Sequence, residues 1–330
     1  MPTDPTALID VHAHFVTDAY VAAARAAGHE HPDGMPSWPS WAAAAHVAFM
    51  DGSGIGKALL SISSPGTHFG DDAAARELSR HVNEHAAQAR AQHPGRFGHL
   101  AALPLPDVEG SIAEARHALD VLAADGVAIL SNHLGVYPGD SRFEPLWAEL
   151  DRRGAIVFVH PTSPPQADAV ALGRPRPMVE FLFDSARAAA DLLLSGALAR
   201  HGRIRWIFTH CGGVLPPLTE RLDLFRFLLP VPPGASDAAS RDQFGDLWHD
   251  LAGTPFPHQA PALAAAFGSE RLLYGSDSCW TPDFAVTAQI HALDAAPPLP
   301  DTSSWRDLTT RNAHRLLARN ETVNSVERPS

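Results

Sequence analysis

The stretch Leu8–Phe15, LIDVHAHF, closes a short apolar run with two histidines that lie one residue apart. Because residues i and i+2 of a β-strand project to the same face, the imidazoles of His12 and His14 point the same way. A single histidine at a strand end is most often a structural hydrogen-bonding group. The pair therefore predicts a binding site only if other strands end in similar side chains.

Runs like this one recur along the chain and alternate with alanine-rich segments of helical apolar spacing. We predict helices over 71–92 and 107–124, and strands over 8–14, 57–63, 97–103, 126–131, 155–160, 204–210, 247–251 and 271–277. Strands that alternate with helices are typical of parallel α/β folds. Eight such strands predict a closed (β/α)8 TIM barrel rather than an open sheet.

Three proline- and glycine-rich stretches interrupt this rhythm and predict long loops. They are residues 28–41, 161–178 and 229–242, which follow the first, fifth and sixth strands. In barrel enzymes such loops carry the groups that bind substrate. With no linker to divide the chain, we predict a single domain over residues 1–319 and a polar, disordered tail over 320–330.

Composition excludes several classes of protein. The formal net charge is −12 over 330 residues, and no basic stripe argues for binding to nucleic acid or to an anionic membrane. The N-terminus lacks the features of a signal peptide, and no apolar run approaches the roughly 20 residues that span a bilayer. Two cysteines define no disulfide framework. These features predict a soluble cytoplasmic protein.

Three more predicted strands end in side chains that can bind a metal ion, namely His160, His210 and Asp277. Together with His12 and His14, they lie at the carboxyl ends of barrel strands, where barrel active sites are built. Neutral imidazoles and one carboxylate suit Zn²⁺, or Mn²⁺ and Fe²⁺ when more oxygen ligands are present. The coincidence of these strand ends predicts a metal site.

Other histidines repeat a ligand-like spacing without the right context. His29 and His31 lie in a proline- and glycine-rich loop that fixes no relative geometry. His81 and His85 lie four residues apart on a predicted helix, but the order is not His-Glu-x-x-His and the helix is expected to face solvent. We predict that neither pair binds the metal.

The residues above fall within motifs that resemble those of the amidohydrolase superfamily over nearly the whole chain. The matching segments are IDVHAHF (9–15), VFVHPT (157–162), FTHCGG (208–213), LLYGSDSCWTP (272–282) and RNAHRLL (311–317). The chain is similar to the branch that contains aminocarboxymuconate-semialdehyde decarboxylase and the aromatic-acid decarboxylases. Within that branch, HPTSPP, GSDSCWTP and the loop over 28–41 look closest to the 6-methylsalicylate decarboxylase-like members.

The resemblance implies roles for individual residues. His12, His14, His160 and Asp277 would bind one divalent metal ion, most commonly Zn²⁺, with Mn²⁺ as an alternative. His210 would be a catalytic histidine beside the metal, and Asp277 would also be a candidate proton donor. In related enzymes a lysine at the end of the fourth strand bridges two metals, but this strand ends AILSNH (128–133) without lysine, which favours one metal.

The segment HCGGVLPPLTER also matches, and it implies that Arg221 pairs with the substrate carboxylate. In some relatives this arginine comes from the neighbouring subunit, so the resemblance also implies a homodimer or higher homo-oligomer. Phe15 and Trp280, with Trp38 and Trp41, would form the walls of an aromatic pocket. Aromatic side chains also fill cores, so simple packing is an equal interpretation of these residues.

One departure from the branch narrows the substrate. The semialdehyde decarboxylase uses a second arginine after its first strand, but no arginine occurs between Ala26 and Ala75. This favours a substrate with one carboxylate. The resemblance then implies non-oxidative decarboxylation of a small 2-hydroxybenzoate-like aromatic acid such as 6-methylsalicylate. Two alternatives remain: hydrolysis of a lactone or amide by a metal-activated water, and a barrel that binds a metal or a partner without catalysis.

Overall fold

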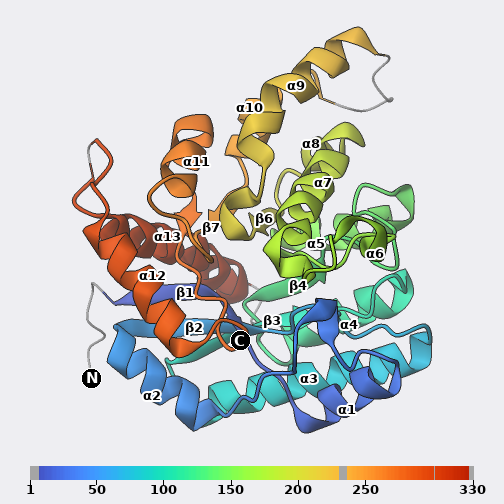
Figure 1. The fold of residues 1–330 in the computed structure, drawn as a ribbon. Helices are drawn as coiled ribbons and strands as arrows, with labels where there is room; N and C mark the ends of the chain where they lie inside the picture. Colours follow the sequence, from blue (N-terminus) through green and yellow to red (C-terminus); the bar gives the residue numbers. More distant parts are fainter. Residues whose placement is uncertain (1–6, 230–235, 301, 327–330) are drawn as a thin grey trace.

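The computed structural model describes residues 7–229, 236–300 and 302–326. Its strands form one parallel sheet in the order of the sequence, and the helices surround it (Figure 1). The strands are β1 (Leu8–His14), β2 (Ile55–Ser61), β3 (Phe97–Ala102), β4 (Gly126–Leu130), β5 (Ile156–His160), β6 (Arg205–Phe208), β7 (Trp248–Asp250) and β8 (Leu272–Leu273). Two bridges, Asp10–Tyr274 and Ala13–Ser278, join the region of β8 back to β1. The predicted (β/α)8 barrel is therefore confirmed.

The helices vary widely in length and follow the strands around the barrel. The α-helices are α1 (Asp18–Ala26), α2 (Ala43–Ser53), α3 (Asp72–Gln92), α4 (Val108–Asp120), α5 (Glu144–Arg153), α6 (Ala167–Val170), α7 (Glu180–Leu194), α8 (Ala197–Arg200), α9 (Leu215–Leu228), α10 (Ser240–Gly245), α11 (Gln259–Phe267), α12 (Asp283–Ala295) and α13 (Trp305–Val326). Four short 3-10 helices are η1 (Pro32–Gly34), η2 (Ser141–Phe143), η3 (Arg176–Met178) and η4 (His210–Gly212). None of the described helices is long and apolar enough to cross a membrane.

Side-chain caps fix where several helices begin. Thr17, Asp71 and Asp107 precede α1, α3 and α4, and each side chain accepts a hydrogen bond from a backbone N–H of the first turn. Such caps satisfy donors that have no partner within the helix. The two predicted helices over 71–92 and 107–124 correspond to α3 and α4, although α4 ends four residues earlier than predicted, at Asp120.

All eight predicted strands are present, and most end one to four residues earlier than the sequence indicated; the early ends of β6 and β8 concern site residues. β6 was expected to reach residue 210 and β8 residue 277, whereas they end at Phe208 and Leu273. His210 and Asp277 both have left-handed backbone conformations, with φ of 52° and 60°. A residue in that region cannot continue a strand. The expectation that His210 and Asp277 are the last residues of strands was wrong, and both lie in turns beyond them.

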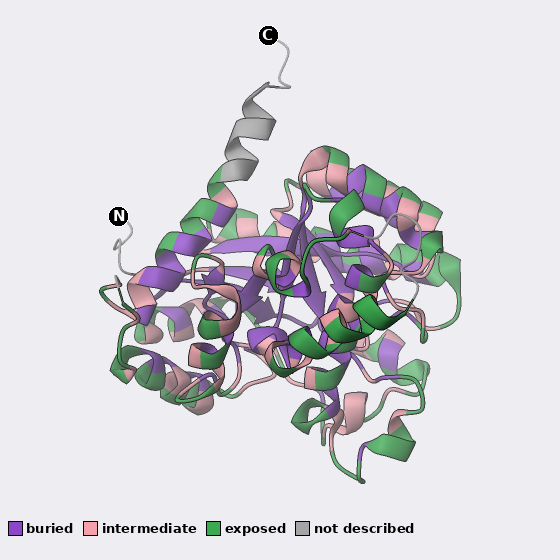
Figure 2. Cartoon of the chain, turned by 90° about the horizontal axis from the view of Figure 1, so that it is seen from above, coloured by how far each residue is buried: buried purple, intermediate pink, exposed green. Residues whose placement is uncertain are grey.

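The strands are buried and the outer faces of the helices are exposed (Figure 2). One apolar cluster combines side chains of successive strands, including Ile9 and Val11 of β1 and Phe158 of β5. The pairing of β1 with β2 shifts register between Asp10 and Ala13. Within the shifted segment, Val11 belongs to this apolar cluster, and the ring of the next residue, His12, also contacts Phe158, with centroids 5.1 Å apart.

The predicted long loops contain short helices. η1 lies in the first, α6 and η3 lie in the second, and α10 begins within the third, where residues 230–235 are outside the described part. At the C-terminus, α13 continues to Val326, beyond the predicted domain end at 319. Residues 327–330 are not described, so the disordered tail and the domain boundary stay predictions, as does the cytoplasmic location.

Candidate metal centre and active site

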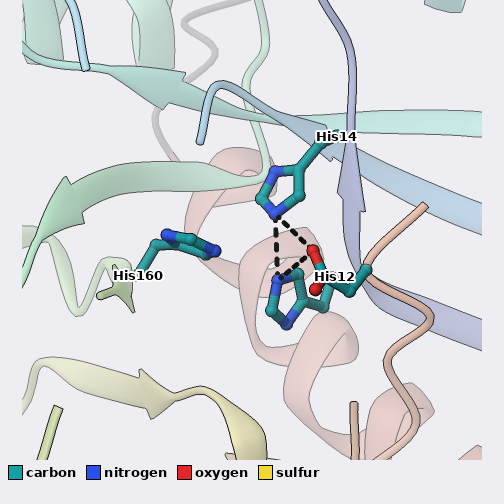
Figure 3. Close-up of side chains that lie close together, drawn as sticks. His12, His14 and His160 are labelled. Carbon is teal, nitrogen blue, oxygen red and sulfur yellow. Dashed lines mark hydrogen bonds and ion pairs between the residues drawn. The ribbon is translucent and has the colours of Figure 1, made fainter. Parts of the chain in front are cut away.

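Side chains from three parts of the chain converge at the carboxyl end of the barrel. His12 and His14 come from β1, His160 ends β5, and Asp277 follows β8. One potential ligand atom from each lies within 4.8 Å of all the others. The Nε2 atoms of His12 and His14 are 2.9 Å apart, and the ring of His160 faces them (Figure 3). Asp277 Oδ1 lies 3.5 Å from His12 Nε2 and 3.3 Å from His14 Nε2.

Hydrogen bonds on the opposite side of each ring fix which nitrogen faces the centre. The Nδ1 atoms donate to oxygen acceptors: His12 to Asp250 Oδ2 at 2.9 Å, His14 to the Ser61 carbonyl at 3.3 Å, and His160 to the Pro161 carbonyl at 2.7 Å. A proton on Nδ1 leaves a lone pair on Nε2. Neutral histidine ligands in metal sites are oriented in the same way.

This arrangement fits a metal ion. The Nε2 atoms of His12 and His14 lie 2.9 Å apart, a distance at which they must share a proton or lie on either side of a bound cation. Three imidazole nitrogens and one carboxylate oxygen are a donor set found in catalytic sites of divalent transition metals. The donor set is therefore that of a divalent metal centre, and the sequence had named all four residues.

Charges within the cluster favour a bound cation. Burial disfavours a charged His12, but Asp250 and Asp277 outweigh it and raise the pKa of His12 to about 10. Burial and the neighbouring histidines hold the pKa of His160 well below its usual value. Burial alone would raise the pKa of Asp277, but hydrogen bonds from His12, His14 and His210 hold it well below its usual value. The two carboxylates thus draw positive charge to the centre, while His160 stays neutral.

Asp250 is a site residue that the sequence analysis missed. It ends β7 and is fully buried, and its Oδ1 accepts hydrogen bonds from the backbone N–H of His210 and Ala252, both at 3.0 Å. Its other oxygen accepts from His12 Nδ1. One carboxylate therefore holds both a metal ligand and the backbone of the predicted catalytic histidine. The only signal in the sequence was that Asp250 is the last polar residue of the predicted strand over 247–251.

The structure brings His210 to the edge of the cluster. Its Nε2 lies 3.6 Å from Asp277 Oδ2, and its ring centroid lies 5.0 Å from that of His12. Its carbonyl accepts a hydrogen bond from Gln259. The left-handed turn after β6 directs the side chain back over the end of the barrel. His210 therefore has the geometry to exchange a proton with Asp277.

The cluster opens into a cavity of about 220 Å³. His160, His210 and Asp277 line it, and its apolar walls include Phe181, Leu182 and Trp280. No lysine or arginine lines this cavity within the described part of the chain. The cavity thus has one metal-binding end and an aromatic wall, and the chain itself supplies no cationic side chain to it.

Two of the predicted substrate-binding residues lie elsewhere. Phe15 is buried outside the lining of this cavity, where it contacts Trp41 and stacks on His85 at centroid distances of 5.6 and 5.9 Å. Arg221 is exposed on α9, with its guanidinium 5.1 Å from the ring centroid of Phe225. Trp280 alone of the predicted substrate contacts lines the cavity.

The histidines set aside as decoys are not in the metal cluster. His29 and His31 line a second cavity of about 790 Å³ beside the first. His81 is exposed on α3, and His85 packs on Phe15. Among the described residues, the four-residue cluster is the only group of this kind with metal-binding geometry.

Comparison with known proteins identifies relatives of the whole chain. Residues 9–319 match the sequence pattern of the amidohydrolase family. The chain is 35% identical over 324 residues to a 6-methylsalicylic acid decarboxylase of Aspergillus aculeatus. The alignment covers 94% of this chain and 96% of that protein. It is 32% identical over 295 residues to the corresponding enzyme of Penicillium expansum, with coverages of 88% and 90%. The resemblance inferred from the motifs is confirmed.

Solved structures superimpose on nearly the whole chain. An amidohydrolase structure superimposes with a TM-score of 0.85 at 30% identity, covering 94% of this chain and 99% of that one. A 5-carboxyvanillate decarboxylase from Novosphingobium aromaticivorans, crystallised with manganese and a nitrobenzoic acid, gives a TM-score of 0.84 at 20% identity, with coverages of 96% and 98%. The latter likeness concerns the fold.

Proposed function

The chain belongs to the amidohydrolase family, and we propose that it is a metal-dependent non-oxidative decarboxylase of a small 2-hydroxybenzoate-like acid. The observation that carries this proposal is the buried His–His–His–Asp cluster at one end of a cavity of about 220 Å³ with an aromatic wall. Those dimensions suit a single substituted ring. Because two relatives that cover most of the chain are 6-methylsalicylic acid decarboxylases, 6-methylsalicylate is the first substrate to test.

We propose Zn²⁺ as the resident ion, held by His12, His14, His160 and Asp277. Histidine-rich sites with one carboxylate favour it, while manganese in a solved decarboxylase of the same fold makes Mn²⁺ the alternative. The ion would act as a Lewis acid and template for the phenolic oxygen and carboxylate of the substrate.

Side chains of the protein would supply the proton that decarboxylation requires. Decarboxylation breaks the bond between the ring carbon and the carboxylate, releases CO₂, and requires a proton on the ring carbon. Asp277 borders the cavity and would pass to the ring carbon a proton that it takes up from His210. His210 Nε2, 3.6 Å from Asp277 Oδ2, would relay the replacement proton from solvent. Trp280 and Phe181 would exclude water and hold the ring.

We propose that Arg221 binds the substrate carboxylate from a neighbouring subunit of a homodimer. Within one chain Arg221 is exposed on α9 and is not part of the cavity. The same helix extends away from the barrel (Figure 1) and exposes several large apolar side chains: Leu224, Phe225, Phe227 and Leu228. Exposed apolar surface of this kind is typical of a protein–protein interface. A second subunit would cover it and bring the guanidinium to a site that lacks a cation.

The test is incubation of the Zn²⁺- or Mn²⁺-loaded protein with 6-methylsalicylate and related ortho-hydroxy acids. We expect stoichiometric CO₂ and, from 6-methylsalicylate, 3-methylphenol. Absence of CO₂ from every ortho-hydroxy acid, together with turnover of lactones or amides, would establish the hydrolytic alternative instead. The two relatives that are 6-methylsalicylic acid decarboxylases support decarboxylation over hydrolysis.

A further inference from the structure

Asp33, in the loop after β1, lies at the border between the two cavities at the carboxyl end of the barrel. It lines both the smaller cavity at the metal cluster and the larger one beside it. The four metal-binding residues line no part of the larger cavity. The carboxylate of Asp33 therefore lies where the smaller cavity meets the larger one.

The structure holds this carboxylate in place from the loop after β5. Asp33 Oδ1 accepts hydrogen bonds from the backbone N–H of Ser163 at 3.2 Å and from its hydroxyl at 2.5 Å. Ser163 follows the metal ligand His160 by three residues, so the two loops are joined close to the metal. At Gly34 a Cβ would lie 2.5 Å from Arg176 Nη1, which shows how closely η1 packs on the segment before α7.

Asp33 carries a negative charge at this position, with the guanidinium of Arg176 close to the adjacent Gly34. It forms no ion pair with any residue in the described ranges, and its Oδ2 has no hydrogen-bond partner there. The lysine- and arginine-free lining of the smaller cavity supplies no counter-charge. Arg176 borders only the larger cavity, where it pairs with Asp168. The site thus has a cation-binding end and an anionic end.

We infer that Asp33 is a specificity-determining residue that restricts the site to aromatic acids with a single carboxylate. The metal end binds the reacting carboxylate, and a second carboxylate on the ring would meet the fixed charge of Asp33. Like charges at close range in a partly desolvated cavity disfavour binding strongly. The free Oδ2 also provides an acceptor for a ring hydroxyl. This inference rests on the proposed function for the orientation of the ring.

The test compares binding of salicylate with that of 4-hydroxyisophthalate, which is salicylate with a second carboxylate. Both are titrated calorimetrically into the Zn²⁺-loaded wild type and into Asp33→Asn, whose Oδ1 retains the acceptor for Ser163. We expect the wild type to prefer salicylate, and the variant to reduce that preference by about tenfold or more while its salicylate affinity changes by less than about threefold. Asp33→Ser also removes the charge but introduces a side chain of a different shape. It must likewise reduce the preference for salicylate over 4-hydroxyisophthalate.

The matched control is Asp168→Asn, which makes the same change of charge on a residue that lines only the larger cavity. We expect its preference to equal that of the wild type. The inference is wrong if Asp33→Asn and Asp33→Ser leave the preference within about twofold of the wild type, or if Asp168→Asn shifts it equally. Because the test compares affinities for two acids and not rates, failure of decarboxylation overturns the proposed function alone.

Discussion

The substrate is expected to be held by a metal ion at the cluster and by Arg221 on helix α9. A single chain brings the parts of the first together but not those of the second. In the cluster, the three histidines are buried and every Nδ1 has an oxygen partner. On α9, Arg221 is exposed and Phe227 is 87% exposed. One chain therefore brings the residues of the metal cluster together by itself, whereas the arginine proposed to bind the carboxylate lies outside the cavity of its own chain. The predictions below test this contrast.

The largest effect is expected from His14→Ala. Removing one imidazole nitrogen leaves a three-residue site, so metal affinity should fall and kcat/KM should decrease by about a thousandfold or more. Metal content after dialysis and decarboxylation rates give the measurements. His81→Ala, a change to an exposed histidine on α3, should retain both properties of the wild type. Normal metal content in His14→Ala would remove His14 from the ligand set.

Arg221→Ala should lower kcat/KM by about a hundredfold with unchanged metal content, because only the contact to the carboxylate is lost. The neighbouring exposed residue Glu220 provides the matched control, and Glu220→Ala should behave as the wild type. Equal activity in Arg221→Ala and the wild type would show that this arginine does not bind substrate.

Mixing the two inactive proteins then separates the subunits. In a dimer of His14→Ala with Arg221→Ala, one site would have an intact metal centre and an intact arginine from its neighbour. Random exchange of subunits should therefore restore about a quarter of wild-type activity if the arginine acts across the interface. Exchange without recovery would place Arg221 in its own subunit's site.

A smaller effect is expected from Asp250→Asn. The amide keeps the shape and still offers Oδ1 to the backbone N–H of His210, but it loses the charge and the second acceptor oxygen that orient His12, so metal affinity should fall by about tenfold to a hundredfold. Competition with a chelator measures the affinity. Asp246→Asn, near the same strand but paired with Arg271 on the surface, is the control. An unchanged affinity would show that Asp250 serves the fold only.

The smallest change in catalysis is expected from Phe227→Ser, which removes an apolar side chain from α9 without touching the cluster. The dissociation constant of the dimer should rise by about tenfold. Activity should fall only at protein concentrations where the dimer dissociates. Analytical ultracentrifugation measures this. Phe284→Ser, at an exposed phenylalanine of α12, should leave association unchanged. If both variants associate as the wild type does, α9 is not the interface.

Much of the site was predictable because it follows the periodicity of strands. His12, His14 and His160 end predicted strands of a parallel barrel, and the carboxyl ends of such strands meet at one rim. The left-handed turns at His210 and Asp277 were not predicted, since such backbone conformations in residues other than glycine leave no pattern in the sequence. Asp250 was missed because an acidic residue in a strand acquires its role only through contacts with distant segments.

By itself, the sequence determined the eight strand–helix units, the metal-binding side chains and the family, because these depend on local periodicity and on residue type. Only the tertiary structure decided that Asp250 joins His12 to His210, that Asp33 lies where the two cavities meet, and that Arg221 lies outside the cavity at the metal cluster. These relations join residues far apart in the chain. They depend on how the loops pack over the barrel, which no local pattern specifies.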